Sequence, residues 1–189
     1  MKKFISILLL IFTVFMAVSC TAVNGTSGTV DKNGSTEPKV TDGLWSKSYR
    51  DDIDCDALVV NAENKIALGA GLELMNKGEI SISVQTYLCD AVEAANNYVI
   101  RFTGGSSFDE FGILRYDDEK TAATNASLVK DYLKSLQEDS LYRSYFPDEE
   151  YKLDEWEVKT FGNYVVYAVL SAENRSAFFG EVEQLLVKV

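Results

Sequence analysis

An alternation of apolar and polar residues predicts a β-hairpin in the middle of the chain. Residues 98–103 place three large side chains on one side of an extended strand, namely Tyr98, Ile100 and Phe102. The run Gly104-Gly105-Ser106-Ser107 then turns the chain, and residues 108–116 are extended again. Glycine supplies the positive φ angles that hairpin turns require, so we interpret this run as a turn and not as a phosphate-binding loop.

A second hairpin is predicted from residues 156–170. Residues 156–160 alternate between apolar and polar, which indicates one wet face, and Phe161-Gly162-Asn163 is typical of a turn. Residues 164–170 are apolar on both faces, which is the pattern of a central, buried strand.

Apolar residues at helical spacing follow each hairpin. One helix is predicted to start at Asp117-Asp118, and Ser171 can cap the other. The two apolar stripes are Leu128, Val129, Tyr132, Leu133 and Leu136, and then Phe178, Phe179, Val182, Leu185 and Leu186. Two earlier helices are predicted over residues 55–68 and around residues 84–92.

The order of these elements predicts an α+β fold with two layers. After Asn97 the order is β-β-α-β-β-α, so two β-β-α units would form one four-stranded antiparallel sheet with the helices packed on one face. The N-terminal helices precede the sheet. Residues 47–189 are long enough for a single domain with one hydrophobic core.

The first twenty residues predict export and lipid attachment. Lys2 and Lys3 precede a short apolar run that ends in Ala17-Val18-Ser19-Cys20. A basic start, an apolar core and small residues before a cut describe a signal peptide, here residues 1–19, and the run is shorter than the roughly 20 residues of a membrane span. The small residues before Cys20 resemble the lipobox of bacterial lipoproteins. This resemblance implies a lipid on Cys20 and a place on the extracytoplasmic face of the membrane.

Residues 20–46 are predicted to be the lipidated cysteine followed by a flexible tether. Glycine, serine, threonine and asparagine dominate this stretch, and such a composition buries too little apolar surface to offset the entropy of ordering the chain. With about 26 residues, the root-mean-square reach of the tether is about 28 Å.

The charge balance and the lack of histidine exclude several functions. The chain has a formal net charge of −11, which repels nucleic-acid backbones, so we expect no nucleic-acid partner. The sequence contains no histidine, which excludes Ser-His-Asp and Cys-His catalysis and histidine-ligated metals. We expect no cofactor.

Two cysteines remain besides Cys20. In the oxidising compartment that export implies, Cys55 and Cys89 could form a disulfide. We favour the alternative that they are two small buried hydrophobic residues, because free cysteine is often buried.

Four acidic residues fit part of a calcium-loop template. Asp52, Asp54, Asp56 and Glu63 occupy its positions one, three, five and twelve. However, Ala57 stands where the loop needs glycine, and the residues after it have the character of a helix. We favour acidic residues that cap a helix, with a calcium-stabilised module as an alternative.

Two groups of carboxylates could supply the acid and base of a glycan hydrolase. They are Asp109-Glu110 and Asp117-Asp118-Glu119. Tyrosines could line a saccharide or peptide groove or pack in the core. They are Tyr49, Tyr87, Tyr98, Tyr116, Tyr142, Tyr145 and Tyr151.

Several segments of the chain together form a recognisable pattern. Besides the lipobox, they are residues 109–115 (Asp-Glu-Phe-Gly-Ile-Leu-Arg), the helix through residues 128–136, Tyr145-Phe-Pro147, residues 158–167 with Gly-Asn-Tyr-Val-Val, and Phe178-Phe179. This pattern resembles the bacterial lipoproteins grouped as domain of unknown function 4358. The resemblance implies an anchored extracytoplasmic domain. It supplies no activity and no site.

We therefore expect a membrane-anchored binding or assembly module of the cell envelope, whose partner is an envelope protein or saccharide. A soluble acidic domain without a nucleophile–base pair or a metal motif fits binding better than catalysis. A carboxylate-based hydrolase of envelope glycans and the calcium-stabilised module are the alternatives.

Overall fold

Two antiparallel hairpins form the centre of the fold. The computed structural model describes residues 47–68, 71–75 and 86–188. The strands are β1 (Glu73–Leu74), β2 (Asn97–Phe102), β3 (Glu110–Arg115), β4 (Glu157–Phe161) and β5 (Tyr164–Val169). The helices are α1 (Cys55–Glu63), α3 (Thr86–Glu93), α4 (Glu119–Glu138), α5 (Ser140–Arg143), the 3₁₀ turn η1 (Pro147–Glu149), α6 (Glu150–Asp154) and α7 (Ala172–Leu186).

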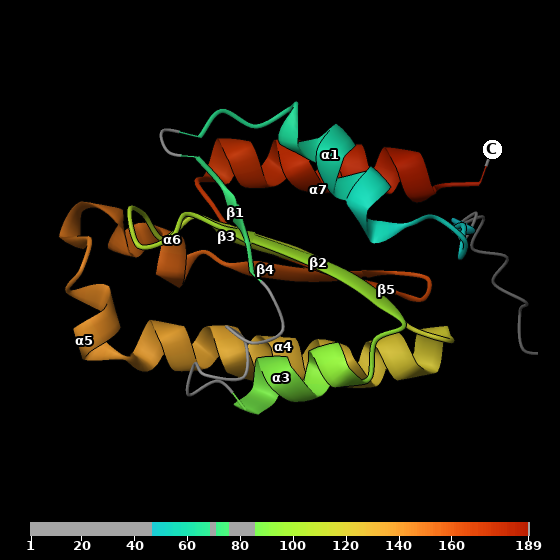
Figure 1. Cartoon of the computed structure of the whole chain (residues 1–189), viewed down its shortest axis with the longest axis horizontal. Coiled ribbons are helices and arrows are strands. Elements are labelled where there is room, and N and C mark those ends of the chain that lie inside the picture. The colour runs from blue at the N-terminus through green and yellow to red at the C-terminus, as the bar shows by residue number, and fades with distance from the viewer. Residues whose placement is uncertain (1–46, 69–70, 76–85, 189) are drawn as a thin grey trace, which may run out of the picture. The chain divides into compact units, whose positions relative to one another are not determined.

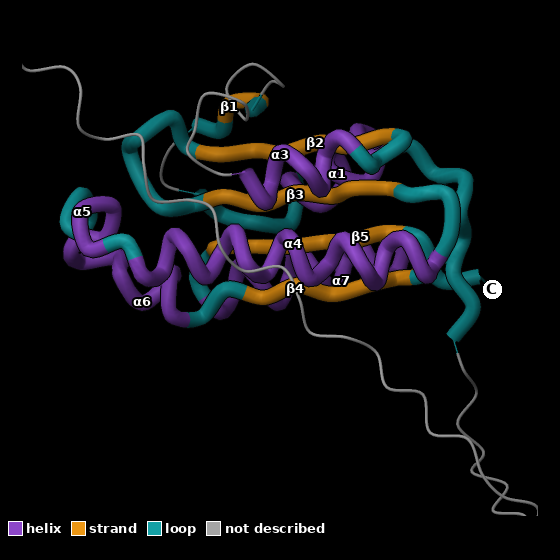
Figure 2. Tube along the Cα trace, turned by 90° about the horizontal axis from the view of Figure 1, so that it is seen from below, coloured by secondary structure: helices purple, strands orange, loops and turns teal. Residues whose placement is uncertain are grey.

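Within the described residues the sheet has five strands in the order β1-β2-β3-β5-β4, and all neighbours are antiparallel (Figure 2). The prediction that both hairpins share one antiparallel sheet is confirmed, but the predicted number of four strands is wrong. The fifth strand, β1, pairs Glu73 with Phe102 at the outer edge of β2. A strand of two residues is too short to show an alternating pattern, so periodicity could not reveal it.

Helices cover both faces of the sheet, so the two-layer prediction, with the helices on one face, is wrong. Figure 1 shows α1 and α7 on one side of the strands, and α3 and α4 on the other. One apolar core joins Val165, Tyr167 and Val169 to α3 and α4, whereas the second joins Val166 and Ala168 to α1 and α7. Because β5 is buried at every position, each of its faces needs a covering layer.

The predicted helix starts near Asp118 and Ser171 are confirmed. The Asp118 carboxylate accepts a hydrogen bond from the backbone N–H of Thr121, and the Ser171 hydroxyl accepts one from that of Asn174. These side chains satisfy N–H groups that have no partner within a helix.

The first helix is shorter than predicted, because α1 ends at Glu63 and not at residue 68. Beyond it, the side chain of Asn174 on α7 accepts a hydrogen bond from the backbone N–H of Ala67 and donates one to its carbonyl. These bonds hold the segment in a non-helical path along α7, where Ile66 and Leu68 pack against the core. In the second predicted helix, Val84 lies outside the described residues.

Substitution of Phe179 by alanine should strongly destabilise the domain. Phe179 is buried, its ring meets that of Phe178 at a centroid distance of 5.6 Å, and the Lys159 ammonium lies 4.4 Å from its centroid. We expect Phe179→Ala to lower the free energy of unfolding by roughly 3–5 kcal/mol in urea denaturation. The exposed Tyr151 is the control, and Tyr151→Ala should change stability by less than about 0.5 kcal/mol. A similar small effect for both variants would contradict the placement of Phe179.

Candidate functional site

A pocket of about 520 Å³ lies at one end of the sheet, where β2 ends and β3 begins. We call it the sheet-end pocket. Its lining residues come from the β2–β3 loop, the strand ends and the α5 region: Phe102, Thr103, Gly105, Ser107, Phe108, Asp109, Glu110, Tyr142, Tyr145 and Phe146. Its volume is within the range of small-molecule sites in proteins.

The loop that forms one wall of the pocket is the predicted glycine-rich turn. Gly104 and Gly105 have φ angles of 55° and 86°, which side chains rarely permit. The Thr103 hydroxyl donates a hydrogen bond to the Ser107 carbonyl at 2.8 Å and closes the loop. The loop joins two strands and does not lead into a helix, so its interpretation as a hairpin turn is confirmed.

Glu110 is a carboxylate buried between the sheet and α4, with 5% of its surface exposed. Tyr167 of β5 donates a hydrogen bond to its Oε1 at 2.7 Å, and Tyr132 of α4 donates to both carboxylate oxygens at 2.9 and 3.0 Å. The two tyrosine rings meet edge to face, with centroids 6.3 Å apart. The carboxylate is thus held by two hydroxyl groups from two layers of the fold.

Gly112 makes this arrangement possible. It pairs with Tyr167 across β3 and β5, and a Cβ atom at position 112 would overlap the Tyr167 ring. The ring therefore lies over the glycine, and its hydroxyl reaches Glu110, two residues away on the same face of β3. Glycine in the interior of a strand often marks such a close approach.

Burial controls the protonation of this cluster. It raises the pKa of the Glu110 carboxyl to about 6, and the bonds from Tyr167 and Tyr132 oppose this rise. Burial, together with the nearby charge of Glu110, raises the pKa of both tyrosines well above the usual value. The tyrosines therefore remain donors at neutral pH, while Glu110 changes charge in the mildly acidic range.

A second polar cluster lies beside the first, around the buried Lys152 of α6. The Lys152 ammonium lies 2.8 Å from Asp109 Oδ1 and 3.0 Å from Glu149 Oε2. Ser107 donates a hydrogen bond to Glu149 at 2.6 Å. Burial opposes the charge of Lys152, but the bonds to the two carboxylates outweigh it and raise the pKa of the ammonium. One cation thus joins the β2–β3 loop to η1 and α6.

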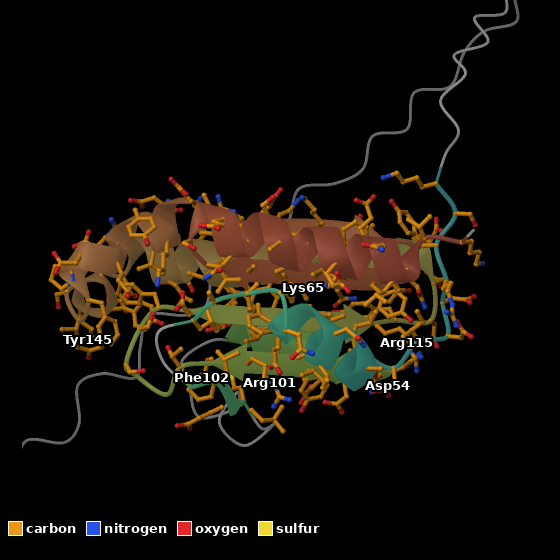
Figure 3. The ribbon with its side chains drawn as sticks, turned by 90° about the horizontal axis from the view of Figure 1, so that it is seen from above. Asp54, Lys65, Arg101, Phe102, Arg115 and Tyr145 are labelled. Atoms are coloured by element: carbon orange, nitrogen blue, oxygen red, sulfur yellow. The ribbon has the colours of Figure 1, made fainter. Side chains whose placement is uncertain are left out.

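Aromatic rings form the outer part of the pocket. The Phe108 ring contacts Tyr142 and Phe146 at centroid distances of 5.1 and 5.0 Å, and Tyr145 packs on Tyr142 at 6.2 Å. Tyr145 is 58% exposed and stands at the rim. Figure 3 places Tyr145 and Phe102 toward the same end of the domain, and Asp54 and Arg115 toward the other.

A salt-bridged arginine supports this aromatic wall. Arg143, the last residue of α5, lies 2.8 Å from Glu150 and 2.7 Å from Asp154, both on α6. The Asp139 carboxylate caps α5 by accepting hydrogen bonds from the N–H groups of Leu141 and Tyr142. These contacts fix the helix that carries Tyr142.

Comparison with known proteins supports the family resemblance. Residues 89–170 match a family model described as Domain of unknown function (DUF4358). No curated protein and no solved structure matches the chain. The DUF4358 match extends from α3 to the residue after β5 and includes both polar clusters. Two of the resembling segments line the sheet-end pocket, through Glu110 and through Tyr145. A third supplies Tyr167, which packs on Gly112 and donates a hydrogen bond to Glu110.

The structure does not bring the four residues of the calcium template together. Asp54 caps α1 by accepting a hydrogen bond from the N–H of Asp56, Asp52 lies 3.3 Å from Arg50, and Glu63 at the far end of α1 lies 2.9 Å from Arg101. Within residues 47–68, 71–75 and 86–188, no group of three or more acidic, cysteine or histidine residues could hold a metal ion.

The two groups of hydrolase candidates lie at opposite ends of β3. Asp109 and Glu110 line the sheet-end pocket, whereas Asp118 caps α4 and Asp117 accepts a hydrogen bond from Asn96. β3 is six residues long, so about 17 Å of strand separates the two groups. A carboxyl from one group and a carboxyl from the other therefore cannot act on the same glycosidic bond.

The cysteines lie in separate cores. Cys55 is buried against α7, Cys89 packs on the α3–α4 side of the sheet, and both are free thiols. Burial raises the pKa of the Cys55 thiol to about 12, so it remains protonated. Cys20 lies outside the described residues.

The sequence analysis did not find Lys152, Glu149, Tyr132 or Tyr167 as site residues. One signal was available, because Glu110 interrupts an apolar strand at an inward-facing position, and a buried charge requires partners. The identity of those partners depends on the packing of α4, α6 and β5 around β3.

Replacement of Glu110 by glutamine should change how stability depends on pH. Because the pKa of Glu110 is raised in the folded state, its contribution to stability is complete below about pH 4.5 and is lost as the pH rises through 6. Between pH 4 and 7 we expect the wild type to lose about 2 kcal/mol relative to Glu110→Gln in urea unfolding.

Glu183→Gln is the matched control for this measurement. The bond to Lys47 lowers the pKa of Glu183, so this carboxylate stabilises the fold at neutral pH and loses that effect as the pH falls. Relative to Glu183→Gln, the wild type should lose stability as the pH falls from 7 to 4, which is the opposite sign to the effect at Glu110. An unchanged profile in Glu110→Gln would contradict the burial of an ionisable carboxyl at position 110.

Proposed function

We propose that this chain is a membrane-anchored extracytoplasmic lipoprotein whose folded domain binds a component of the cell envelope in the sheet-end pocket. The observation that carries the proposal is the pocket itself. It joins a polar inner wall, with Glu110 and Asp109, to an outer wall of aromatic rings. A few convergent polar groups within an apolar lining are typical of binding sites.

The place where the described chain begins supports this arrangement. Ser48 accepts a hydrogen bond from Lys188, Tyr49 bridges to Val187, and its ring packs on Phe161 next to the β4–β5 turn. β3 runs from Glu110 at the pocket to Arg115 at this other end (Figures 1 and 3). The described chain therefore begins at the end of the domain away from the pocket, and this supports a tether from Cys20 that joins the domain there.

The contacts of the pocket carboxylates favour binding over the hydrolase alternative. Glycan hydrolysis requires two facing carboxyl groups about 5–9.5 Å apart, one of which must protonate the substrate and the other attack it or activate water. Here Asp109 is paired with Lys152, and both oxygens of Glu110 accept hydrogen bonds from tyrosines. These carboxylates are better placed to hold polar groups than to act as acid and base.

The anchor itself rests on the signal sequence. Among the described residues, no helix has the length and apolar character that a membrane crossing requires.

Mass spectrometry of the mature N-terminus tests the lipid anchor. The mature chain should begin at Cys20 and carry the added mass of a lipid. Cys20→Ala should abolish cleavage before residue 20 and should yield no lipidated protein. Retention of Met1, or an unmodified Cys20, would refute the anchor.

Site-specific photocrosslinking in intact cells tests the binding function. A photoreactive phenylalanine at the pocket-rim position Tyr145 should form a discrete adduct with an envelope component. The same probe at Tyr87 is the control, because Tyr87 is 46% exposed on α3 and does not line the pocket. A second substitution, Phe108→Ala, should weaken the adduct at position 145. Equal adducts at both positions would count against a binding role for the pocket.

A further inference from the structure

The charges beside the sheet-end pocket do not balance. Three carboxylates, those of Asp109, Glu110 and Glu149, lie here beside one ammonium, that of Lys152. Among the described residues, Lys152 forms salt bridges with Asp109 and Glu149 and not with Glu110. Within the described part of the chain, Glu110 has neutral tyrosine hydroxyls as partners and forms no salt bridge with a lysine or arginine. When Glu110 is ionised, its charge is therefore buried without a counterion, which is unfavourable.

The Glu110 carboxylate still has capacity to accept a hydrogen bond. An ionised carboxylate offers about four lone-pair sites, and the two tyrosines supply only two hydroxyl protons. Glu110 is also one of the residues that line the pocket, so a ligand bound there would lie close to it. A positive group in the pocket could supply the missing counterion.

The aromatic wall favours the same kind of group. The faces of phenylalanine and tyrosine rings carry negative potential and attract cations within about 6 Å of the ring centre. Phe102, Phe108 and Tyr145 contribute rings to the pocket, and none of the described residues that line it is a lysine or arginine. The net charge of −11 adds a negative field that attracts cations to the domain.

We infer that the sheet-end pocket recognises an organic ammonium group, which the aromatic rings hold and the Glu110 carboxylate neutralises. This inference rests on the proposed binding function and names the chemistry of the ligand. A divalent metal ion would need several free oxygen ligands, and the described residues offer no such cluster. An anionic ligand would meet Asp109 and Glu110 and would be repelled.

Two probes of nearly the same shape test the inference. Choline carries a quaternary nitrogen, and 3,3-dimethyl-1-butanol has a neutral carbon in its place. Binding of each to the full chain, in a non-ionic polyethylene glycol ether detergent, is measured by NMR titration at pH 7.5. Choline should bind at least tenfold more tightly than the neutral probe and should shift the resonances of Tyr145 and Ser107.

Variants at the pocket identify the groups responsible. Glu110→Gln keeps the size and an acceptor for the tyrosines but removes the charge, so it should weaken choline at least tenfold and leave the neutral probe unchanged. Glu183→Gln makes the same charge change at Lys47, near the opposite end of the domain, and should leave choline binding within twofold of the wild type. This control separates the local effect of Glu110 from the overall charge.

A surface variant keeps the test valid if Glu110→Gln does not fold. Tyr145→Ala removes an exposed ring at the rim and should weaken choline severalfold, whereas Tyr151→Ala, which removes an exposed ring outside the pocket lining, should not. Equal affinities for the two probes, or no binding of choline at the pocket, would overturn the ammonium inference. The crosslink at position 145 would still be able to support the binding function, so the two failures can be distinguished.

Discussion

The burial of the two central strands on both faces is the constraint on which the rest of the structure depends. Every residue of β5 is buried, and β3 is buried at all positions but its last. A sheet with such strands at its centre cannot leave one face in water, because the apolar surface would remain exposed. The pairing of α3 with α4 on one side and of α1 with α7 on the other follows from this requirement. At the end of the sheet where β2 ends and β3 begins, the β2–β3 loop packs with α5 and α6, and the pocket lies there.

Glu110 is the place where local sequence rules and the fold disagree. A carboxylate at the start of a buried strand costs stability unless other groups satisfy it. The fold provides Tyr132 and Tyr167, and Gly112 removes the side chain that would block the second of them. Several groups from distant parts of the chain are thus arranged around one unfavourable residue. Proteins commonly tolerate such conflicts where a functional site requires them.

The sequence predicted local features well and the arrangement of layers poorly. Both hairpins, the caps at Asp118 and Ser171 and the buried strand after Gly162 depend on neighbouring residues, so periodicity and turn chemistry were sufficient. The apolar run of residues 164–170 also implied a third layer, because a strand that is apolar on both faces needs cover on both. The prediction of two layers followed the order of the β-β-α units instead. β1 was beyond prediction because two residues carry no period. The candidate site could be predicted only in part, since Glu110 was visible as a charge in a strand. Its partners Tyr132 and Tyr167 become its neighbours only after folding.

The salt bridges of Lys152 have a consequence for the thermodynamics of recognition. This one side chain holds the β2–β3 loop against η1 and α6, and Glu149 also accepts hydrogen bonds from Ser107 and from the N–H of Phe108. The mouth of the pocket is therefore already ordered in the free protein. A ligand that entered it would lose its own freedom but would not need to order the loop, so more of its contact energy would appear as affinity. Lys152 does not line the pocket, yet through this ordering it would influence how tightly such a ligand is held.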